Sequence, residues 1–127
     1  MSYILLVEDN QENADMTIRI LKSAGYTVKH VLQGLQAGPL ARAEPPSLIL
    51  MDFDLPDING RVMALTLKKQ LGSVPIIAVT ARTGEAEARI AQRFGMSAFI
   101  SKPFLPEHLL AVVGQFVPAP TLVIRKD

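Results

Sequence analysis

Leu48-Ile49-Leu50-Met51-Asp52 is an uninterrupted apolar run that ends in a single carboxylate. Three other apolar runs also lead into polar groups: Ile4-Leu5-Leu6-Val7 into Glu8-Asp9, Ile76-Ile77-Ala78-Val79 into Thr80, and Ala98-Phe99-Ile100 into Ser101-Lys102-Pro103. In an open parallel α/β sheet, ligands bind at the carboxyl ends of the strands. The order of these residues therefore predicts one site that holds three carboxylates, a hydroxyl and an ammonium group.

Short apolar runs alternate with amphipathic stretches along the chain, which is the pattern of βαβ units. Near-continuous apolar strands are typical of a parallel sheet covered by helices on both faces. We expect strands near residues 3–8, 27–31, 47–52, 75–80 and 98–101. We expect helices over about 11–24, 60–71 and 85–94, and a last helix that starts at Pro106, a favourable first helical residue.

The segment from Gly34 to Glu44 has a helical pattern that is interrupted by Gly38-Pro39. A proline inside a helix costs about 3 kcal/mol, because it removes a backbone donor and clashes with the preceding turn. We therefore expect a kinked, short or late-starting helix there.

The composition limits the classes of function. The chain has 127 residues, the size of one domain, and 49% of them are apolar. Lys and Arg number 13 against 12 Asp and Glu, a balance that gives no support to nucleic-acid binding. The absence of cysteine excludes disulfides and thiolate metal sites. No apolar stretch approaches the roughly 20 residues that span a bilayer, and the N-terminus lacks the features of a signal peptide. We therefore expect a cytoplasmic protein without a membrane partner.

The acidic cluster has its own chemistry. Carboxylates that lie together repel one another, so either a pKa rises or a cation lies among them. Oxygen ligands without His or Cys favour Mg²⁺, which also binds phosphate oxygens. Mg²⁺ and the Lys102 ammonium would attract a phosphoryl group, which Asp52 could accept as an acyl phosphate. Thr80 could donate a hydrogen bond to that group, and the small Ala81 leaves the site open.

Each of these residues also has a structural interpretation when it is taken alone. Glu8-Asp9 could be the acidic start of a helix, and Asp52 could be a turn residue. Thr80 could be a cap, and Lys102 could be a solvated surface charge. The complete set, in order at the ends of successive strands, favours the functional interpretation.

Taken together, these segments resemble the response-regulator receiver domains of two-component signalling. The resemblance covers about residues 3–116 and rests on four segments: Val7-Glu8-Asp9-Asn10, Met51-Asp52-Phe53-Asp54-Leu55-Pro56 with Gly60, Val79-Thr80-Ala81 and Phe99-Ile100-Ser101-Lys102-Pro103. It implies a flavodoxin-like α/β fold, with a doubly wound sheet of five parallel strands in the order 2-1-3-4-5 and five flanking helices. We expect a receiver domain over residues 1–117. Residues 118–127 would be a linker, an extra packed segment or a partner-binding strand.

The resemblance implies a role for each residue of the acidic cluster. Asp52 would be the phosphoacceptor and would also face the metal. Asp9 would bind Mg²⁺ directly and Glu8 through water, and the backbone carbonyl of Asp54 would complete the protein ligands.

Further roles are implied around the phosphoryl group. Lys102 would contact that group, and its peptide bond to Pro103 would be cis. Thr80 and Phe99 would form a coupled switch pair. The rim of the site would carry the side chains of Asp54, Ala81 and Arg82.

The function implied by the resemblance is a phosphorylation-dependent switch rather than an enzyme. A sensor histidine kinase or a histidine phosphotransfer protein would donate the phosphoryl group, with the first helix as its docking surface. The face built by the fourth helix, fifth strand and fifth helix would then change its affinity for a downstream protein. The chain would be a monomer or a weak dimer.

Two alternatives stay open at this point. Asp52-Phe53-Asp54 also fits the Asp-x-Asp motif of magnesium phosphohydrolases of the haloacid-dehalogenase type. In that family the extra metal acids come near the end of the chain, whereas here the acidic pair comes first. The other alternative is a receiver that serves as a scaffold without being phosphorylated.

Overall fold

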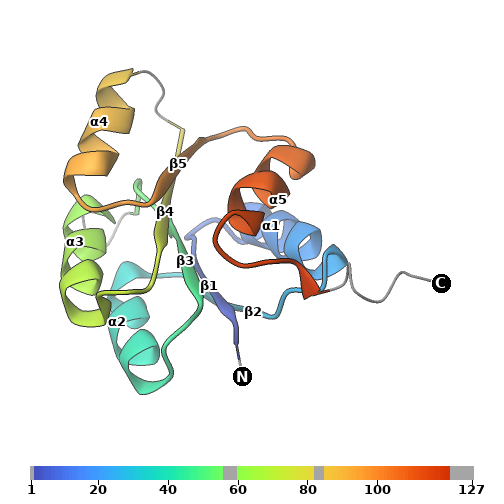
Figure 1. Ribbon diagram of the computed structural model, residues 1–127, viewed down its shortest axis with the longest axis horizontal. Coiled ribbons are helices and arrows are strands. Elements are labelled where there is room, and N and C mark those ends of the chain that lie inside the picture. Colours follow the sequence, from blue (N-terminus) through green and yellow to red (C-terminus); the bar gives the residue numbers. More distant parts are fainter. Residues whose placement is uncertain (1, 56–59, 82–84, 121–127) are drawn as a thin grey trace.

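The structure is a computed structural model that describes residues 2–55, 60–81 and 85–120 (Figure 1). Its centre is one sheet of five parallel strands in the order β2-β1-β3-β4-β5. The strands are β1 (Ile4–Val7), β2 (Val28–Val31), β3 (Leu48–Asp52), β4 (Ile76–Thr80) and β5 (Ala98–Ser101). The predicted sheet, including its strand order, is confirmed.

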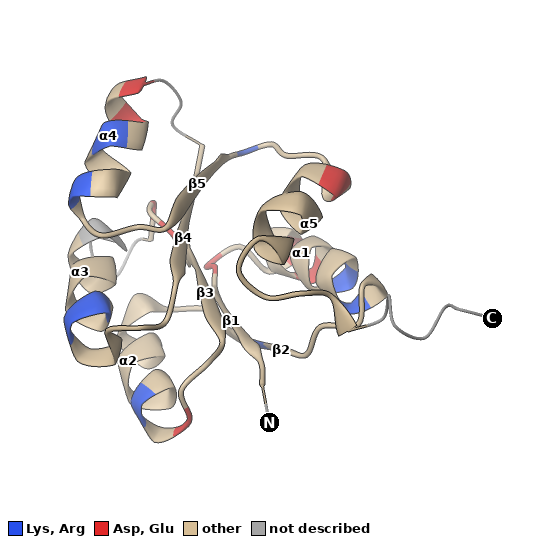
Figure 2. Ribbon diagram, in the orientation of Figure 1, with Lys and Arg blue, Asp and Glu red and all other residues tan. Residues whose placement is uncertain are grey.

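Five helices of the described residues cover the two faces of the sheet. They are α1 (Gln11–Ser23), α2 (Gly34–Ala43), α3 (Gly60–Leu71), α4 (Glu85–Arg93) and α5 (Pro106–Gly114). Figure 1 shows α1 and α5 on one face and α2, α3 and α4 on the other. Figure 2 shows that Lys, Arg, Asp and Glu lie mostly on the helices, whereas the strands carry few charged residues.

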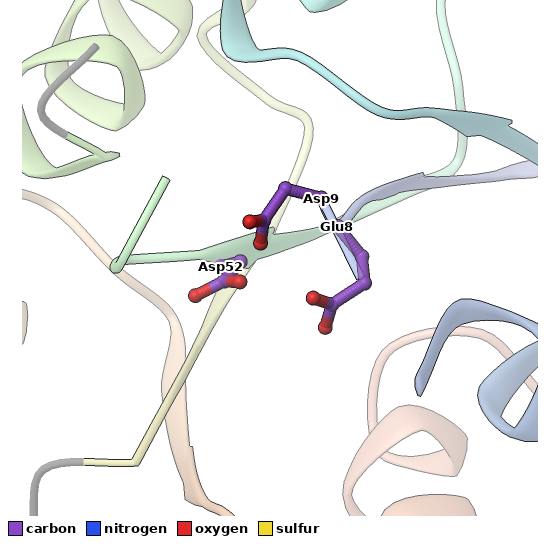
Figure 3. Close-up of side chains that lie close together, drawn as sticks. All are labelled: Glu8, Asp9 and Asp52. Carbon is purple, nitrogen blue, oxygen red and sulfur yellow. The ribbon is translucent and has the colours of Figure 1, made fainter. Parts of the chain in front are cut away.

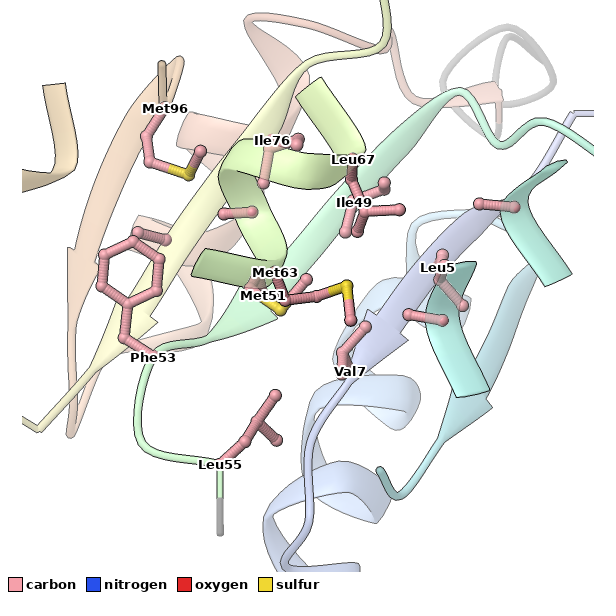
Figure 4. Close-up of a cluster of buried hydrophobic side chains, with 14 of the residues drawn as sticks. Leu5, Val7, Ile49, Met51, Phe53, Leu55, Met63, Leu67, Ile76 and Met96 are labelled. Atoms are coloured by element: carbon pink, nitrogen blue, oxygen red, sulfur yellow. The ribbon is translucent and has the colours of Figure 1, made fainter. Parts of the chain in front are cut away.

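The strands place two hydrophobic clusters on opposite faces of the sheet. Side chains alternate across a strand, so Leu5 and Ile49 pack with Leu67 on the face covered by α2, α3 and α4 (Figure 4). Leu6 and Leu50 pack on the face covered by α1 and α5. β1, β3 and β4 are buried along their whole length, which explains why their sequences are apolar without interruption.

The helices end close to where the glycines predict. Gly25 follows α1 with φ +94° and Gly95 follows α4 with φ +83°. Such a left-handed conformation costs glycine little and stops a helix. The observed bounds of α1, α3 and α4 differ from the predicted ones by no more than one residue.

The second helix narrows one expectation. Of the kinked, short or late-starting helix expected there, the late start is excluded: α2 begins at Gly34 and runs for ten residues with Pro39 inside it. Its start is supported by the Gln33 amide, which donates to the Gln36 side chain (3.1 Å). Its buried positions are all small: Gly34, Ala37, Gly38 and Ala41. Close packing of this small-residue face on the sheet offsets the unfavourable helix propensity of the segment.

The outer edge of the sheet carries a polar contact. Lys29, in edge strand β2, pairs with Glu44 at the end of α2 and lies over the ring of Tyr3, 4.7 Å from its centre. The Tyr3 hydroxyl in turn donates to the backbone carbonyl of Glu44.

The chain beyond α5 begins as a packed segment. The Tyr26 hydroxyl donates to the carbonyl of Val117, and Val117 and Ala119 pack against the cluster under α1 and α5. Residues 121–127 lie outside the described residues, so the predicted role of the tail stays a prediction. Within the described ranges, no helix has the length and apolar character needed to cross a bilayer.

The buried face of α3 should carry much of the stability. Leu67 is 0% exposed and Leu35, on α2, is 60% exposed. We expect Leu67→Ala to lower the free energy of unfolding by about 2–5 kcal/mol, because it leaves a cavity in the core. The control Leu35→Ala should change it by less than about 0.5 kcal/mol. Urea denaturation measures both, and equal losses in the two variants would contradict this account of the core.

Candidate functional site

Hydrogen bonds that continue the sheet past its strand ends position the polar residues. The Glu8 amide donates to the Val31 carbonyl (3.2 Å), and the Lys102 amide donates to the Thr80 carbonyl (2.8 Å). Parallel strands end at the same edge, so these contacts deliver their polar side chains to one place. The edge is the one that the sequence predicts.

Three carboxylates lie together at this edge. Glu8, Asp9 and Asp52 each offer an oxygen, and the three oxygens lie within 4.8 Å of one another. Figure 3 shows Glu8 and Asp9 leaving the end of β1 and Asp52 leaving the end of β3. Glu8 and Asp52 are buried, whereas Asp9 is exposed. The cluster therefore has two buried members and one that reaches solvent.

Lys102 is the cation of the site. Its ammonium donates to Glu8 Oε1 (2.9 Å) and to Asp52 Oδ2 (3.3 Å). The other oxygens of both carboxylates have backbone donors: the Asn10 amide for Glu8 (3.2 Å) and the Asp54 amide for Asp52 (2.8 Å). The peptide bond between Lys102 and Pro103 is cis.

Burial changes the acidity of the site. Loss of solvent raises the pKa of Asp52 to about 6, although the backbone hydrogen bond from Asp54 and the charge of Lys102 both act to lower it. Burial alone would lower the pKa of Lys102, but its hydrogen bond to Glu8 and the charge of Asp52 outweigh burial and raise it. Lys102 therefore stays protonated, and Asp52 is half ionised at about pH 6 and becomes fully ionised only well above it.

Asp54 makes a second set of contacts. Its Oδ2 accepts a hydrogen bond from the Thr80 hydroxyl (2.9 Å) and another from the Ala81 amide (3.3 Å). Thr80 is fully buried, whereas the side chains of Asp54 and Ala81 are exposed. The structure thus brings the predicted rim residues Asp54 and Ala81 together with Thr80. Arg82, the third predicted rim residue, lies outside the described residues.

Two supporting residues were missed by the sequence analysis. The side chain of Asn10 accepts from the Asn13 amide (2.8 Å) and caps α1, which follows the acidic pair directly. A ring nitrogen of His30 lies 2.8 Å from the Glu8 carbonyl. Asn10 is a strong helix-capping residue in front of a helical pattern, so its role could have been predicted. The role of His30 depends on the pairing of β2 with β1, which no local signal gives.

A cavity of about 380 Å³ opens beside the carboxylates, between α1 and α5. Asp52 and Lys102 line it together with apolar side chains, among them Leu6, Met16, Leu50 and Phe104. It gives a reactant access to Asp52 from a largely apolar space.

Phe99 lies away from the carboxylates, on β5. Its ring is half-buried and lines a second cavity, of about 260 Å³, with Ala88, Ala91 and Met96. Thr80 and Phe99 are on neighbouring strands, where Ala78 pairs with Phe99 and Thr80 pairs with Ser101. The two residues of the predicted switch pair therefore lie on adjacent strands, but they are not paired directly opposite each other.

The donor set fits a hard divalent cation. All three side chains offer oxygen, and the described residues bring no His or Cys into the cluster. Mg²⁺ binds oxygen at about 2.1 Å and keeps several waters. Oxygens within 4.8 Å of one another can share such an ion when one of them binds through water.

A comparison with models of protein families identifies the family of this chain. The model of the response regulator receiver domain matches residues 4–114. The chain belongs to this family. Receiver domains are the signalling phosphoacceptors of two-component systems rather than classical enzymes, and they interact with histidine kinases or phosphotransfer proteins and with downstream targets.

Individual receiver proteins are similar over nearly the whole chain. The polar-differentiation response regulator DivK of Brucella ovis is 32% identical over 116 residues, which cover 90% of this chain and 94% of DivK. The chemotaxis protein CheY4 of Vibrio cholerae has a TM-score of 0.85 at 25% identity, covering 92% of this chain and 99% of CheY4. A CheY-like receiver domain of Methanospirillum hungatei has a TM-score of 0.78 at 28% identity, and the match covers 91% of this chain and 92% of that domain's chain.

The raised pKa of Asp52 gives a pH-dependent stability. The folded pKa of about 6 lies above the 3.8 of an unperturbed Asp, so the folded receiver binds this proton more tightly than the unfolded chain. The resulting stabilisation is complete below about pH 4 and is lost as the pH rises through 6. Asp52→Asn has no such proton to lose. Without Mg²⁺, its free energy of unfolding should therefore rise by about 1–3 kcal/mol relative to that of the unaltered receiver as the pH goes from 4 to 7.5.

Urea denaturation at several pH values, with a chelator present, measures this difference. Asp15→Asn, at an exposed position of α1, is the matched control and should follow the unaltered receiver. If the free energy of unfolding changed with pH in the same way in Asp52→Asn and in the unaltered receiver, the proposed effect of burial on Asp52 would be refuted.

Proposed function

We propose that this receiver domain is a phosphorylation-dependent switch that accepts a phosphoryl group on Asp52. The observation that carries the proposal is the position of the Asp52 carboxylate. It is 3% exposed at the end of β3, within hydrogen-bond reach of an ammonium and in a cluster with two further carboxylates. A structural acid would not need a partly buried cation and a second buried acid at the same point.

The chemistry proposed is nucleophilic transfer. An oxygen of ionised Asp52 forms a bond to phosphorus while the bond from phosphorus to the donor's imidazole nitrogen breaks, which leaves an acyl phosphate on the receiver. Lys102 neutralises part of the charge on the phosphoryl oxygens, and Thr80 donates a hydrogen bond to one of them. The cavity beside Asp52 admits the donor's side chain.

We propose Mg²⁺ as the cofactor of this step, because its charge would offset both the acidic cluster and the incoming phosphoryl group. Asp9 and Asp52 would bind it directly, Glu8 would bind it through water, and the backbone carbonyl of Asp54 would complete the set. The exposed position of Asp9 and the oxygen-only donor set support this assignment.

The phosphoryl donor proposed is a sensor histidine kinase or a histidine phosphotransfer protein. We propose α1 as its docking surface, since α1 lines the cavity at Asp52 and carries the half-exposed Met16. Output would come from the face of α4, β5 and α5, with Thr80 and Phe99 as the local readout. The space beside the Phe99 ring allows that ring to change its packing.

The division of the chain is also a proposal. The receiver domain would extend over residues 1–117, since Val117 still packs against the core. Residues 118–127 would form a linker or a partner-binding segment. We propose a monomer or a weak dimer.

Membership of the receiver family argues against the hydrolase alternative. So does the chain order, because the acidic pair directly after β1 precedes Asp52. A scaffold that is never phosphorylated differs from our proposal in one measurable property, which is the chemical labelling of Asp52.

Labelling by a small phosphodonor tests the acceptor. We expect incubation with acetyl phosphate and Mg²⁺ to add one phosphoryl mass to the unaltered receiver, because Asp52 is accessible through the cavity. Asp52→Asn should reduce labelling to background, and the control Asp15→Asn should retain it. Intact-mass spectrometry reads the result. Labelling that persists in Asp52→Asn would reject Asp52, and no labelling of the unaltered receiver would favour a scaffold.

Removal of one carboxylate tests the metal site. We expect Asp9→Asn to weaken Mg²⁺ binding by about tenfold or more, because the loss of a residue that only supports a metal ligand already costs about this much. Isothermal titration calorimetry measures the affinity without any phosphodonor. The control is Asp15→Asn, which should bind Mg²⁺ like the unaltered receiver; equal affinities in all three proteins would exclude Asp9 as a ligand.

A further inference from the structure

We propose that the carboxylate of Asp54 is an internal competitor of the phosphoryl group. It occupies two hydrogen-bond donors beside Asp52 that a phosphoryl oxygen would otherwise use. The inference rests on the proposed role of Asp52 and concerns the regulation of that same site.

The contacts define a small oxyanion site that is already filled. The Thr80 hydroxyl (2.9 Å) and the Ala81 amide (3.3 Å) both donate to one oxygen, Oδ2 of Asp54. Donors from consecutive residues that converge on one anionic oxygen are the arrangement that binds oxyanions. Here the anion is a side chain of the protein itself.

This oxyanion site lies next to the phosphoacceptor. The Asp54 amide donates to Asp52 Oδ1 (2.8 Å), and β3 and β4 pair Asp52 with Val79, the residue before Thr80. A phosphoryl group on Asp52 would therefore stand beside the two donors that Asp54 holds. Thr80 is fully buried, so its hydroxyl can only exchange one nearby acceptor for another.

The two acceptors exclude each other by stoichiometry. A hydroxyl carries one hydrogen, and so does a backbone amide. A phosphoryl oxygen gains these donors only after Asp54 has released them. The two anions also repel each other at short range, so Asp54 weakens phosphoryl binding through lost donors and through charge.

The Asp54 carboxylate can be released toward solvent. The Asp54 side chain is exposed, so water can solvate its carboxylate once Thr80 and Ala81 have turned to another acceptor. Asp54 thus sets a threshold for occupancy of the site without blocking it. It is a positioning residue for the switch hydroxyl and takes no part in bond formation.

Beryllofluoride, a non-covalent analogue of the phosphoryl group, tests the competition. At Mg²⁺ concentrations that saturate each protein, we expect Asp54→Ala to bind it roughly tenfold more tightly than the unaltered receiver, the effect of about one charge-assisted hydrogen bond. Glu107→Gln removes the same charge from an exposed position at the start of α5 and should bind as the unaltered receiver does. Affinity in Asp54→Ala that is unchanged or weaker overturns the inference.

A double-mutant cycle and an amide signal separate the competition from a structural role of Asp54. In a Thr80→Ala background, the gain from Asp54→Ala should shrink to less than about threefold, because one of the contested donors is gone. In the unliganded protein, Asp54→Ala should shift the Ala81 amide resonance. If Asp54→Ala raised the beryllofluoride affinity by the full factor in the Thr80→Ala background, or if the Ala81 amide resonance did not shift, the result would count against the competition.

The same titration distinguishes the two proposals. Failure of the unaltered receiver to bind beryllofluoride overturns the phosphoacceptor role of Asp52 together with the inference. Binding by the unaltered receiver without a gain in Asp54→Ala overturns the inference alone.

Discussion

The contact of one ammonium with two buried carboxylates governs the functional edge of this molecule. Burying a carboxylate is costly unless it is paired and hydrogen-bonded, and Glu8 and Asp52 are both buried within reach of Lys102. Lys102 comes from the far end of the chain, so the site forms only when β1, β3 and β5 are assembled. With Asp9 included, the cluster keeps more negative than positive charge. That imbalance makes the site suited to a divalent cation, and through the cation to a phosphoryl dianion.

The packing of the hydrophobic sheet stabilises this polar edge and fixes its geometry. Apolar residues on both faces of β1, β3 and β4 fix the register of the strands. Since the register is fixed, the polar residue at the end of each of these strands has one possible position. Backbone bonds past the strand ends, such as that from Lys102 to Thr80, extend this order into the loops. The packing of apolar side chains on the two faces of the sheet therefore determines the geometry of the site.

The sequence predicts the strands and most helix ends because the signals are local. Apolar runs mark β1, β3, β4 and β5, and Gly25 and Gly95 mark helix ends through their positive φ. The gathering of Glu8, Asp9, Asp52 and Lys102 was predictable too, since parallel strands share one edge. The sequence left the start of α2 open, because the packing of its small residues, which outweighs Pro39, is a tertiary effect. The contacts of His30 and of the Asp54 carboxylate were not predictable, because they depend on loop geometry and strand pairing that local sequence does not encode.

The Lys29–Glu44 pair at β2 has a consequence for assembly. An edge strand offers unpaired backbone groups to any passing chain, and a lysine on that strand discourages strand addition. In this molecule the charge on β2 is anchored by Glu44 and by the ring of Tyr3. One margin of the sheet is thereby guarded against aggregation and domain swapping.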